Sequence, residues 1–179
     1  MNMNTHYVVD MMTANPIVVG PETTVGRADL LAQGKAIHYL LVVDHYDLVG
    51  VVCGCDLYRE GEATAIASCI RRAPITIDDQ ATAEEAVQAM RRGAVGCLPV
   101  VDWSESLRGI VTAHDLRDAG VLGAAGRPRC ACCGTTHGVA PSNDAPEVGG
   151  AHFCIRCIDQ GKRPTSSCDE LYFTLGGGD

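Results

Sequence analysis

The stretch that decides the fold is LVGVVCGCDL at residues 48–57, because it recurs as LRGIVTAHDL at residues 107–116. In both copies an apolar, β-branched run ends at a short polar segment with Asp-Leu. This pattern is typical of a buried strand that leads directly into a helix. A strand–helix unit that occurs twice indicates an internal repeat, which has to be recognised before any domain is assigned.

The repetition extends toward the N-terminus of both stretches. YLLVVD (39–44) recurs as CLPVVD (97–102), and VVDMMTANPIVVGPETTV (8–25) aligns with IASCIRRAPITIDDQATA (66–83). In the second alignment Pro16 falls on Pro74 and Thr24 falls on Thr82, at the same offset of 58 residues. Two units of similar length therefore follow one another in the chain.

Each unit has the pattern of a βαββα fold. Thr24 and Thr82 are expected to N-cap the first long helix, with Thr82 and Glu85 forming a capping box. Gly34 and Gly93 are expected at the ends of these helices. The other elements are expected as a short apolar helix (8–12 and 66–71), a strand after the proline (16–19 and 74–77), two hairpin strands (39–43 and 48–53; 97–101 and 107–112) and a closing helix that begins at Asp56 or Asp115.

These motifs resemble the cystathionine-β-synthase (CBS) domain in its tandem form, the Bateman module. The resemblance covers roughly residues 5–122 and predicts repeats at 5–62 and 63–122. It implies an α/β (α+β) fold in which two βαββα repeats pack as a pair. CBS pairs commonly associate through their helices, so a homodimer is expected.

The resemblance also implies a ligand. CBS pairs are sensor modules for adenosyl compounds such as AMP, ADP, ATP or S-adenosylmethionine, and their motif ends in Ser/Thr, two variable residues and Asp. GIVTAHD matches this motif, so a carboxylate is available for the ribose hydroxyls and a hydroxyl for a phosphate. The ligand-binding residues carried over are Gly109, Thr112 and Asp115, with Ile75, Thr76 and Leu98 expected beside the adenine.

The first copy departs from this motif. Cys53 replaces the Ser/Thr, although Asp56 remains, and a thiol is a weak hydrogen-bond partner. The Thr112/Asp115 site is therefore expected to be the better one, and the Cys53/Asp56 site degraded or empty. Many AMP-binding members also carry basic residues just before LPVV. Gly96-Cys97 stand there in this chain, which points to a nucleoside-like or weakly bound ligand.

Simpler interpretations of the same residues remain open. Asp115 can serve only as a helix N-cap, and Thr112 can bond only to backbone. His114 lacks the additional His or carboxylate ligands that a phosphohydrolase needs. The cysteines dispersed through residues 1–123 are expected to be buried thiols.

The sequence beyond residue 123 indicates a second module. GAAGRPR (123–129) is expected to be a linker, and 130–175 a small ribbon held by a metal. The four ligands are expected to be the two Cys-x2-Cys pairs, Cys130, Cys133, Cys154 and Cys157. Their spacing suits a tetrahedral structural site. The module resembles a zinc ribbon or a rubredoxin-like fold, with Zn favoured over Fe because aromatic residues are scarce.

Other ligand sets and roles stay open for this tail. Cys132, His137, His152 and Cys168 are competing ligands, and two disulfides are an alternative that needs an oxidising compartment. A segment with so few large apolar residues cannot form much of a hydrophobic core by itself. The bound metal ion is therefore expected to support folding rather than catalysis.

Composition narrows the function. The net charge is −8 with 14 basic and 22 acidic residues, which makes nucleic acid an improbable partner. No apolar run could span a bilayer, and the N-terminus lacks signal-peptide features, so a cytoplasmic protein is expected. The sequence thus favours a non-enzymatic regulator with an adenosyl ligand and an unidentified protein partner. The alternatives are a regulator that binds nucleic acid through its zinc ribbon, and an Fe-loaded electron-transfer module.

Overall fold

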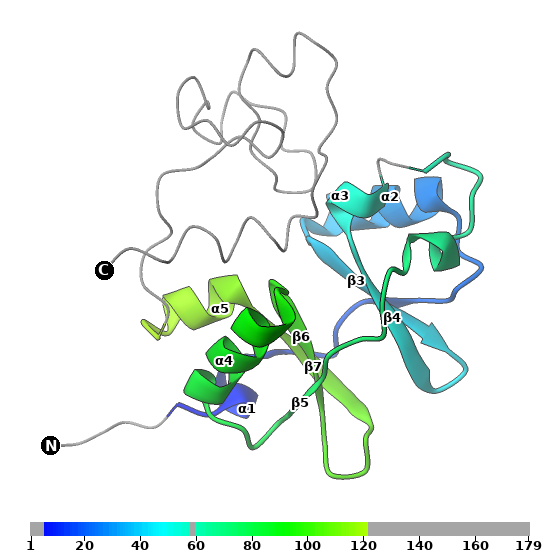
Figure 1. Cartoon of the computed structure of the whole chain (residues 1–179). Helices are drawn as coiled ribbons and strands as arrows, with labels where there is room; N and C mark the ends of the chain where they lie inside the picture. The colour runs from blue at the N-terminus through cyan, green and yellow to red at the C-terminus, as the bar shows by residue number, and fades with distance from the viewer. Residues whose placement is uncertain (1–5, 58–59, 122–179) are drawn as a thin grey trace, which may run out of the picture.

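The computed structural model describes residues 6–57 and 60–121 of the 179-residue chain. These residues form two similar units, each built from a β-hairpin with helices packed against it (Figure 1). The predicted α/β fold with two paired repeats is confirmed. The ribbon predicted at 130–175 lies outside the described residues. None of the helices in the described ranges has the length and apolar character that a membrane span requires.

The elements follow the same order in both units. The first contains α1 (Val8–Met11), β1 (Thr13–Ala14), β2 (Val18–Val19), α2 (Val25–Lys35), β3 (Tyr39–Asp44), β4 (Asp47–Cys53) and α3 (Gly54–Leu57). The second contains the 3-10 helix η1 (Ile66–Cys69), β5 (Ile77–Asp78), α4 (Ala83–Gly93), β6 (Cys97–Val101), β7 (Leu107–Thr112) and α5 (Ala113–Asp118). One sheet has the order β2-β3-β4, and the other has the order β1-β7-β6-β5.

The two long helices begin where the sequence predicts. The Thr24 side chain accepts a hydrogen bond from the Arg27 amide, and Thr82 forms the predicted capping box with Glu85. These hydrogen bonds from Thr82 lower the pKa of the Glu85 carboxyl. Local side-chain bonds to the first turn are therefore sufficient to fix both helix starts.

The two helices end within one residue of the predicted positions, at Lys35 and Gly93, but other residues cap them. The left-handed residues that terminate α2 and α4 are Ala36 and Ala94, with φ of 51° and 48°, and not Gly34 or Gly93. Gly93 is required for a different reason: a Cβ atom there would lie 2.4 Å from Ile75 Cδ1. The missing side chain thus makes room for the segment that links the repeats, a contact that local sequence does not reveal.

Both faces of each hairpin are covered, which explains its nearly continuous apolar sequence. In β3 and β4, alternate residues Leu40, Val42 and Val52 belong to the core packed under α2. Their neighbours Tyr39 and Val51 project from the other face, toward the second repeat. The period of two along each strand therefore divides the side chains between a core and an interface.

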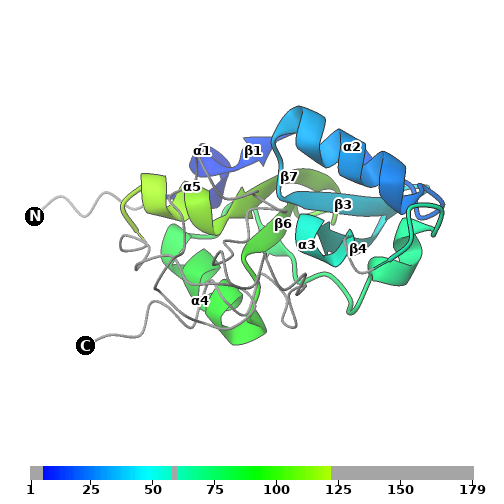
Figure 2. The same ribbon diagram turned by 90° about the horizontal axis from the view of Figure 1, so that it is seen from above.

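The N-terminal segment of the first repeat packs into the second repeat. Val8 is fully buried in the core formed with α4, β6, β7 and α5. Its amide donates to the Ala81 carbonyl at 2.8 Å, and the Ala83 amide donates to the His6 carbonyl at 2.8 Å. β1 continues this contact by pairing antiparallel with β7. Figures 1 and 2 both show α1 beside the helices of the second repeat and away from α2.

The first segment of the second repeat packs in turn into the first repeat. Ile66 and Cys69 of η1 are buried in the core under α2. The Ile66 amide donates to the Thr23 carbonyl at 2.7 Å, and the Val25 amide donates to the Thr64 carbonyl at 2.8 Å. The unit that repeats in the sequence is therefore not the unit that packs, because the two copies exchange their first segments.

This exchange predicts the effect of shortening a side chain at Ile66. We expect Ile66→Ala to lower the free energy of unfolding by about 2–5 kcal/mol, because it leaves a cavity in the core of the other repeat. Leu30→Ala on the exposed face of α2 is the control, with an expected change within about 0.5 kcal/mol. Urea unfolding measures both. Equal, small effects would show that η1 does not fill that core.

Candidate functional site

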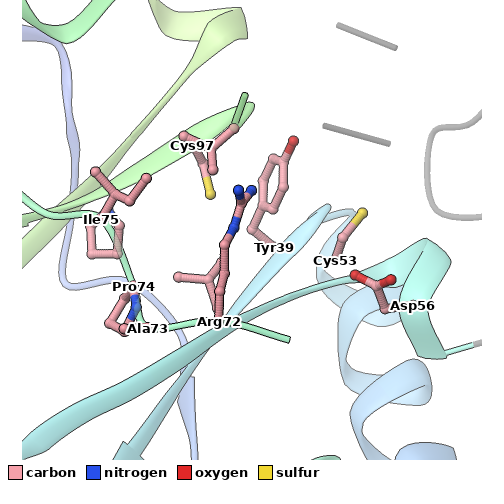
Figure 3. A pocket seen from close by; sticks show the side chains of 11 residues that line it. Tyr39, Cys53, Asp56, Arg72, Ala73, Pro74, Ile75 and Cys97 are labelled. Atoms are coloured by element: carbon pink, nitrogen blue, oxygen red, sulfur yellow. The ribbon is translucent and has the colours of Figure 1, made fainter. Parts of the chain in front are cut away.

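A pocket lies where the two repeats meet (Figure 3). The first repeat contributes residues from β3, β4 and α3, and the second contributes residues from β6 and the turn before it. The segment that links the repeats closes one side. The described lining residues are Tyr39, Val51, Cys53, Asp56, Arg72, Ala73, Pro74, Ile75, Val95, Cys97 and Pro99. A molecule bound there would contact both repeats at once.

Local geometry explains how the first repeat reaches this pocket. Tyr39 begins β3 and is the cross-strand partner of Cys53, which ends β4. The chain then turns into α3, which carries Asp56. Because Tyr39 and Val51 lie on the strand face that points away from the core, they meet the second repeat directly. The end of the hairpin therefore places an aromatic ring, a thiol and a carboxylate around one space.

The Asp56 carboxylate is paired with Arg71. Arg71 Nε donates to Asp56 Oδ1 at 3.1 Å, and the side chains are 52% and 10% exposed, respectively. A carboxylate that is nearly buried needs a charged or hydrogen-bonding partner, since its desolvation is costly. The half-exposed arginine is the less constrained member of the pair. The residue to which Asp56 bonds can therefore change while Asp56 itself stays in place.

Arg72 is held at the end of α4. Its two terminal nitrogens donate to the Gly93 carbonyl at 2.7 Å and to the Ala94 carbonyl at 3.2 Å. A cation at the C-terminus of a helix is favourable because the last carbonyls carry partial negative charge. Figure 3 shows the Arg72 side chain extending to the side of the pocket where Tyr39 and Cys97 lie. Both arginines of this pair thus bond to groups of the folded protein.

The described cysteine side chains of the two repeats are packed in the interior. The Cys53, Cys69 and Cys97 side chains are buried, as the sequence predicts for the dispersed cysteines. Burial raises the pKa of the Cys69 thiol and keeps it protonated at neutral pH. Within the described part of the chain, no three His, Cys, Asp or Glu side chains gather closely enough to hold a metal. The predicted ligands Cys130, Cys133, Cys154 and Cys157 lie outside it.

Thr112 and Asp115 are joined to each other. The Thr112 amide and hydroxyl both donate to Asp115 Oδ2 at 2.7 Å, and the Asp115 amide donates to Thr112 Oγ1 at 3.4 Å. This reciprocal arrangement is a capping box at the start of α5. The simpler interpretation of the motif, a helix cap, is thus realised in the structure. His114 is exposed and lies 3.5 Å from Asp118.

Gly109 allows a backbone contact. A Cβ atom there would lie 2.6 Å from Met12 Sδ and 2.8 Å from the Thr13 carbonyl oxygen. The close approach that the motif glycine permits is therefore that of β1, which pairs with β7 at this point. In the first repeat, Gly50 similarly accommodates Ile70. Both glycines serve the exchange between the repeats.

The structure redistributes the predicted site residues. Ile75 was expected beside Thr112 and Asp115, but it lines the pocket that contains Asp56. Leu98 is fully buried in the core of the second repeat, and the Thr76 side chain is exposed. The structure therefore places Ile75 and Leu98 in different surroundings, and the expected contacts of the adenine stay a prediction. Tyr39, Arg72 and Cys97 were missed, although Arg71-Arg72 is a visible basic pair directly before the second proline motif.

Both described units match one family of known domains. The sequence matches the CBS domain family over residues 8–62 and again over residues 66–121. This chain belongs to the CBS domain family. The predicted recognition of a tandem CBS pair is therefore confirmed.

Curated relatives are longer proteins that contain a similar region. Inosine-5'-monophosphate dehydrogenase of Korarchaeum cryptofilum is 36% identical over 101 residues, which are 56% of this chain and 21% of the enzyme. The Mycobacterium tuberculosis enzyme is 31% identical over 107 residues, 58% of this chain and 20% of the enzyme. The chain thus spans about a fifth of the length of these relatives.

Solved CBS structures share the architecture. CBSX2 in complex with AMP is 28% identical with a TM-score of 0.58, and the match covers 65% of this chain and 96% of that chain. CBSX2 is a CBS-pair protein from Arabidopsis thaliana. The cytosolic domain of the Mg²⁺ channel MgtE in complex with ATP is 28% identical with a TM-score of 0.57, covering 64% and 48%.

The packing at Gly109 predicts the outcome of adding a methyl group. We expect Gly109→Ala to destabilise the CBS pair by about 1–3 kcal/mol, because the backbone of β1 has to move. Gly34→Ala in α2, where the added atom meets open space, should instead stabilise by up to about 1 kcal/mol. Thermal unfolding compares the two. A neutral Gly109→Ala would contradict the close contact with β1.

Proposed function

We propose that this chain is a regulatory protein whose CBS pair binds an adenosyl ligand of the AMP, ADP, ATP or S-adenosylmethionine class. The pocket lined by both repeats carries this proposal. Two structural relatives at 28% identity hold AMP and ATP, which supports the same ligand class here. The curated relatives are enzymes of which this chain matches only a fifth, so their catalytic activity is not part of the proposal.

The chemistry of the pocket suits a nucleoside. Asp56 can accept the hydroxyl groups of a ribose, since an ionised carboxylate is an acceptor with several lone pairs. Val51, Ile75, Val95 and Pro99 offer apolar contacts to a planar base. This combination of an apolar wall with a few polar groups is typical of small-molecule sites.

The position of the pocket gives a route to regulation. A ligand that contacts β3 and β4 on one side and β6 on the other favours the relative placement of the repeats that fits it best. It shifts that equilibrium only by the difference between its affinities for the two arrangements. A partner that binds one arrangement would then sense the ligand. We include a homodimer and a protein partner in this proposal.

The second motif position remains part of the proposal. Gly109, Thr112 and Asp115 match the family motif more closely than the first copy does, whereas the described pocket contains the first copy. A ribose at Asp115 would compete with the hydrogen bonds that Asp115 makes to Thr112. A ribose at Asp56 would compete with the hydrogen bond from Arg71, the partner of Asp56 in the described part of the chain. The two positions therefore make different demands on a ligand.

Equivalent substitutions in the two repeats test the proposal. We expect AMP or ATP to raise the temperature midpoint of unfolding of the wild-type protein. The free energy of unfolding should increase by about 2.7 kcal/mol at a ligand concentration of 100 times Kd. Asp56→Asn should abolish most of this shift, because it removes the charge that the ribose hydroxyls bond. Asp115→Asn is the matched variant. Thermal-shift titration and calorimetry measure both.

The outcomes separate the two positions. Loss of binding only in Asp56→Asn assigns the ligand to the described pocket, and loss only in Asp115→Asn assigns it to the second motif. The absence of any response to AMP, ADP, ATP and S-adenosylmethionine in the wild-type protein would overturn the proposed function.

We also propose that the tail holds one structural Zn through Cys130, Cys133, Cys154 and Cys157. The spacing of the two Cys-x2-Cys pairs supports this assignment. Elemental analysis of the purified chain should give close to one Zn per protein, and Cys130→Ser with Cys154→Ser should release it. A Cys132→Ser variant, which should keep the metal, is the control. Iron together with a visible absorption band would favour the rubredoxin-like alternative.

A further inference from the structure

The turns of both hairpins carry an exposed aromatic side chain. Tyr46, in the turn between β3 and β4, is 98% exposed, and Trp103, in the turn between β6 and β7, is 91% exposed. The chain is poor in aromatic residues, and Trp103 is its one tryptophan. Trp and Tyr are the side chains that most often contribute large shares of the binding energy at protein interfaces. The two turns are therefore candidates for contact with a partner.

The turn that presents Trp103 is held together by Asp102. Asp102 Oδ1 accepts hydrogen bonds from the Ser104 amide at 2.9 Å, the Ser104 hydroxyl at 2.6 Å and the Ser106 amide at 3.1 Å. The bond from the Ser104 hydroxyl lowers the pKa of the Asp102 carboxyl, which stays ionised at neutral pH. Trp103 is thus displayed on an ordered turn, which reduces the conformational entropy lost when a partner binds.

The first hairpin displays Tyr46 on a tight turn. His45 and Tyr46 form two-residue turn between the paired residues Asp44 and Asp47, and His45 has the positive φ, 55°, that such turns require. Figure 1 shows both hairpins extending downward, so that the two turns lie on the same side of the molecule. A partner that approaches this side meets an aromatic residue from each repeat.

The turns stand at the opposite ends of the hairpin strands from the pocket. Tyr39 begins β3, Cys53 ends β4 and Cys97 begins β6, and all three line the pocket. A partner at the turns therefore leaves the pocket open. Any change in the relative placement of the repeats also changes the spacing of the two turns, because each turn belongs to a different repeat.

Acidic residues accompany both aromatic side chains. Asp44 and Asp47 flank the first turn, which is exposed throughout. Asp102 and Glu105 belong to the second turn, where Arg108 Nε lies 4.0 Å from Asp102 Oδ2. Within residues 6–57 and 60–121, neither Asp47 nor Glu105 takes part in an ion pair. The charge that remains is negative and complements a cationic partner.

We propose that Asp44, Tyr46, Asp47, Trp103 and Glu105 form a docking surface for a basic, arginine-containing segment of a partner protein. Guanidinium groups stack on the faces of Trp and Tyr while carboxylates hold their charge, so one kind of side chain satisfies both features of the surface. The proposal rests on the proposed function for the existence of a protein partner, and it specifies where and by what chemistry that partner binds.

The same charges disfavour two other occupants. A second copy of this chain that docked through the same turns would bring carboxylates against carboxylates. A membrane surface rich in anionic lipids would be repelled for the same reason, although Trp and Tyr suit the membrane interface. Both occupants are included as outcomes of the test.

The fluorescence of Trp103 tests the surface directly, because no other tryptophan contributes. The probes are synthetic peptides of equal length in which Ser alternates with Arg, with citrulline (the neutral isostere of Arg) or with Glu. We expect the Arg peptide to change the Trp103 emission of the full chain saturably and to bind at least about tenfold more tightly than the citrulline peptide. The Glu peptide should have no effect, and added salt should weaken the Arg peptide.

Substitutions then locate the binding, with calorimetry as the measurement. Trp103→Ala and Tyr46→Ala should each weaken the Arg peptide by about fivefold or more, as expected of interface anchors. Asp47→Asn combined with Glu105→Gln should weaken it as well. Glu84→Gln combined with Asp118→Asn is the matched control, because it removes the same charge from exposed positions on α4 and α5. We expect this control to bind the Arg peptide nearly as tightly as the wild-type protein does.

Each contrary result overturns the docking surface. Such results are an Arg peptide that does not bind, a citrulline peptide that binds equally well, and equal losses in the two double variants. Trp103 emission that acrylamide cannot quench in the free protein would show that another segment of the chain or a second copy covers the surface. A change of emission with phosphatidylserine vesicles but not with the Arg peptide would assign it to a membrane. The titrations contain no nucleotide, so a failure to bind AMP or ATP affects the proposed function alone.

Discussion

The exchange of first segments between the two repeats is the constraint on which the rest of the structure depends. Val8 completes the core of the second repeat, and Ile66 completes the core of the first. Either repeat alone would expose part of its core and leave backbone groups such as the Ala81 carbonyl without these partners. The glycines of both hairpins, Gly50 and Gly109, provide the space for the exchanged chain. The pair is therefore the folding unit, although the sequence repeats in halves.

The same exchange creates the pocket and makes its two halves unequal. The segment of the second repeat that connects η1 to β5 has to leave the core of the first repeat and pass between the hairpins. It does so without joining a strand, and its side chains bond Asp56 and the end of α4. In the other direction, β1 pairs with β7 over Thr13–Ala14. A pseudo-symmetric fold thus presents two chemically different positions, and the two residues that precede each proline by two and three positions contribute to this difference.

The two motif carboxylates show how equal sequence positions acquire different chemistry. Asp115 bonds to the amide and hydroxyl of Thr112, three residues away, so its environment is encoded locally. In the first repeat Cys53 stands at the position of Thr112. The described partner of Asp56 is Arg71, fifteen residues along the chain. A local capping box is present whenever the helix is formed. An ion pair with a half-exposed arginine opens more easily than this capping box. Asp56 is therefore the carboxylate that can exchange its partner for a ligand more readily.

The sequence by itself determined the repeats, the family, the hairpin strands and the starts of α2 and α4, because strand periodicity and helix caps depend on residues that are close in the chain. It also located Asp56 and Ile75 as candidate ligand-binding residues, but it could not group them. Only the tertiary structure decided that Ile75 lies with Asp56, that Leu98 belongs to the core, and that Arg72 reaches the pocket. These placements follow from the exchange between the repeats, in which contacts join residues that are distant in sequence. No local pattern records which hairpin a crossing segment will meet.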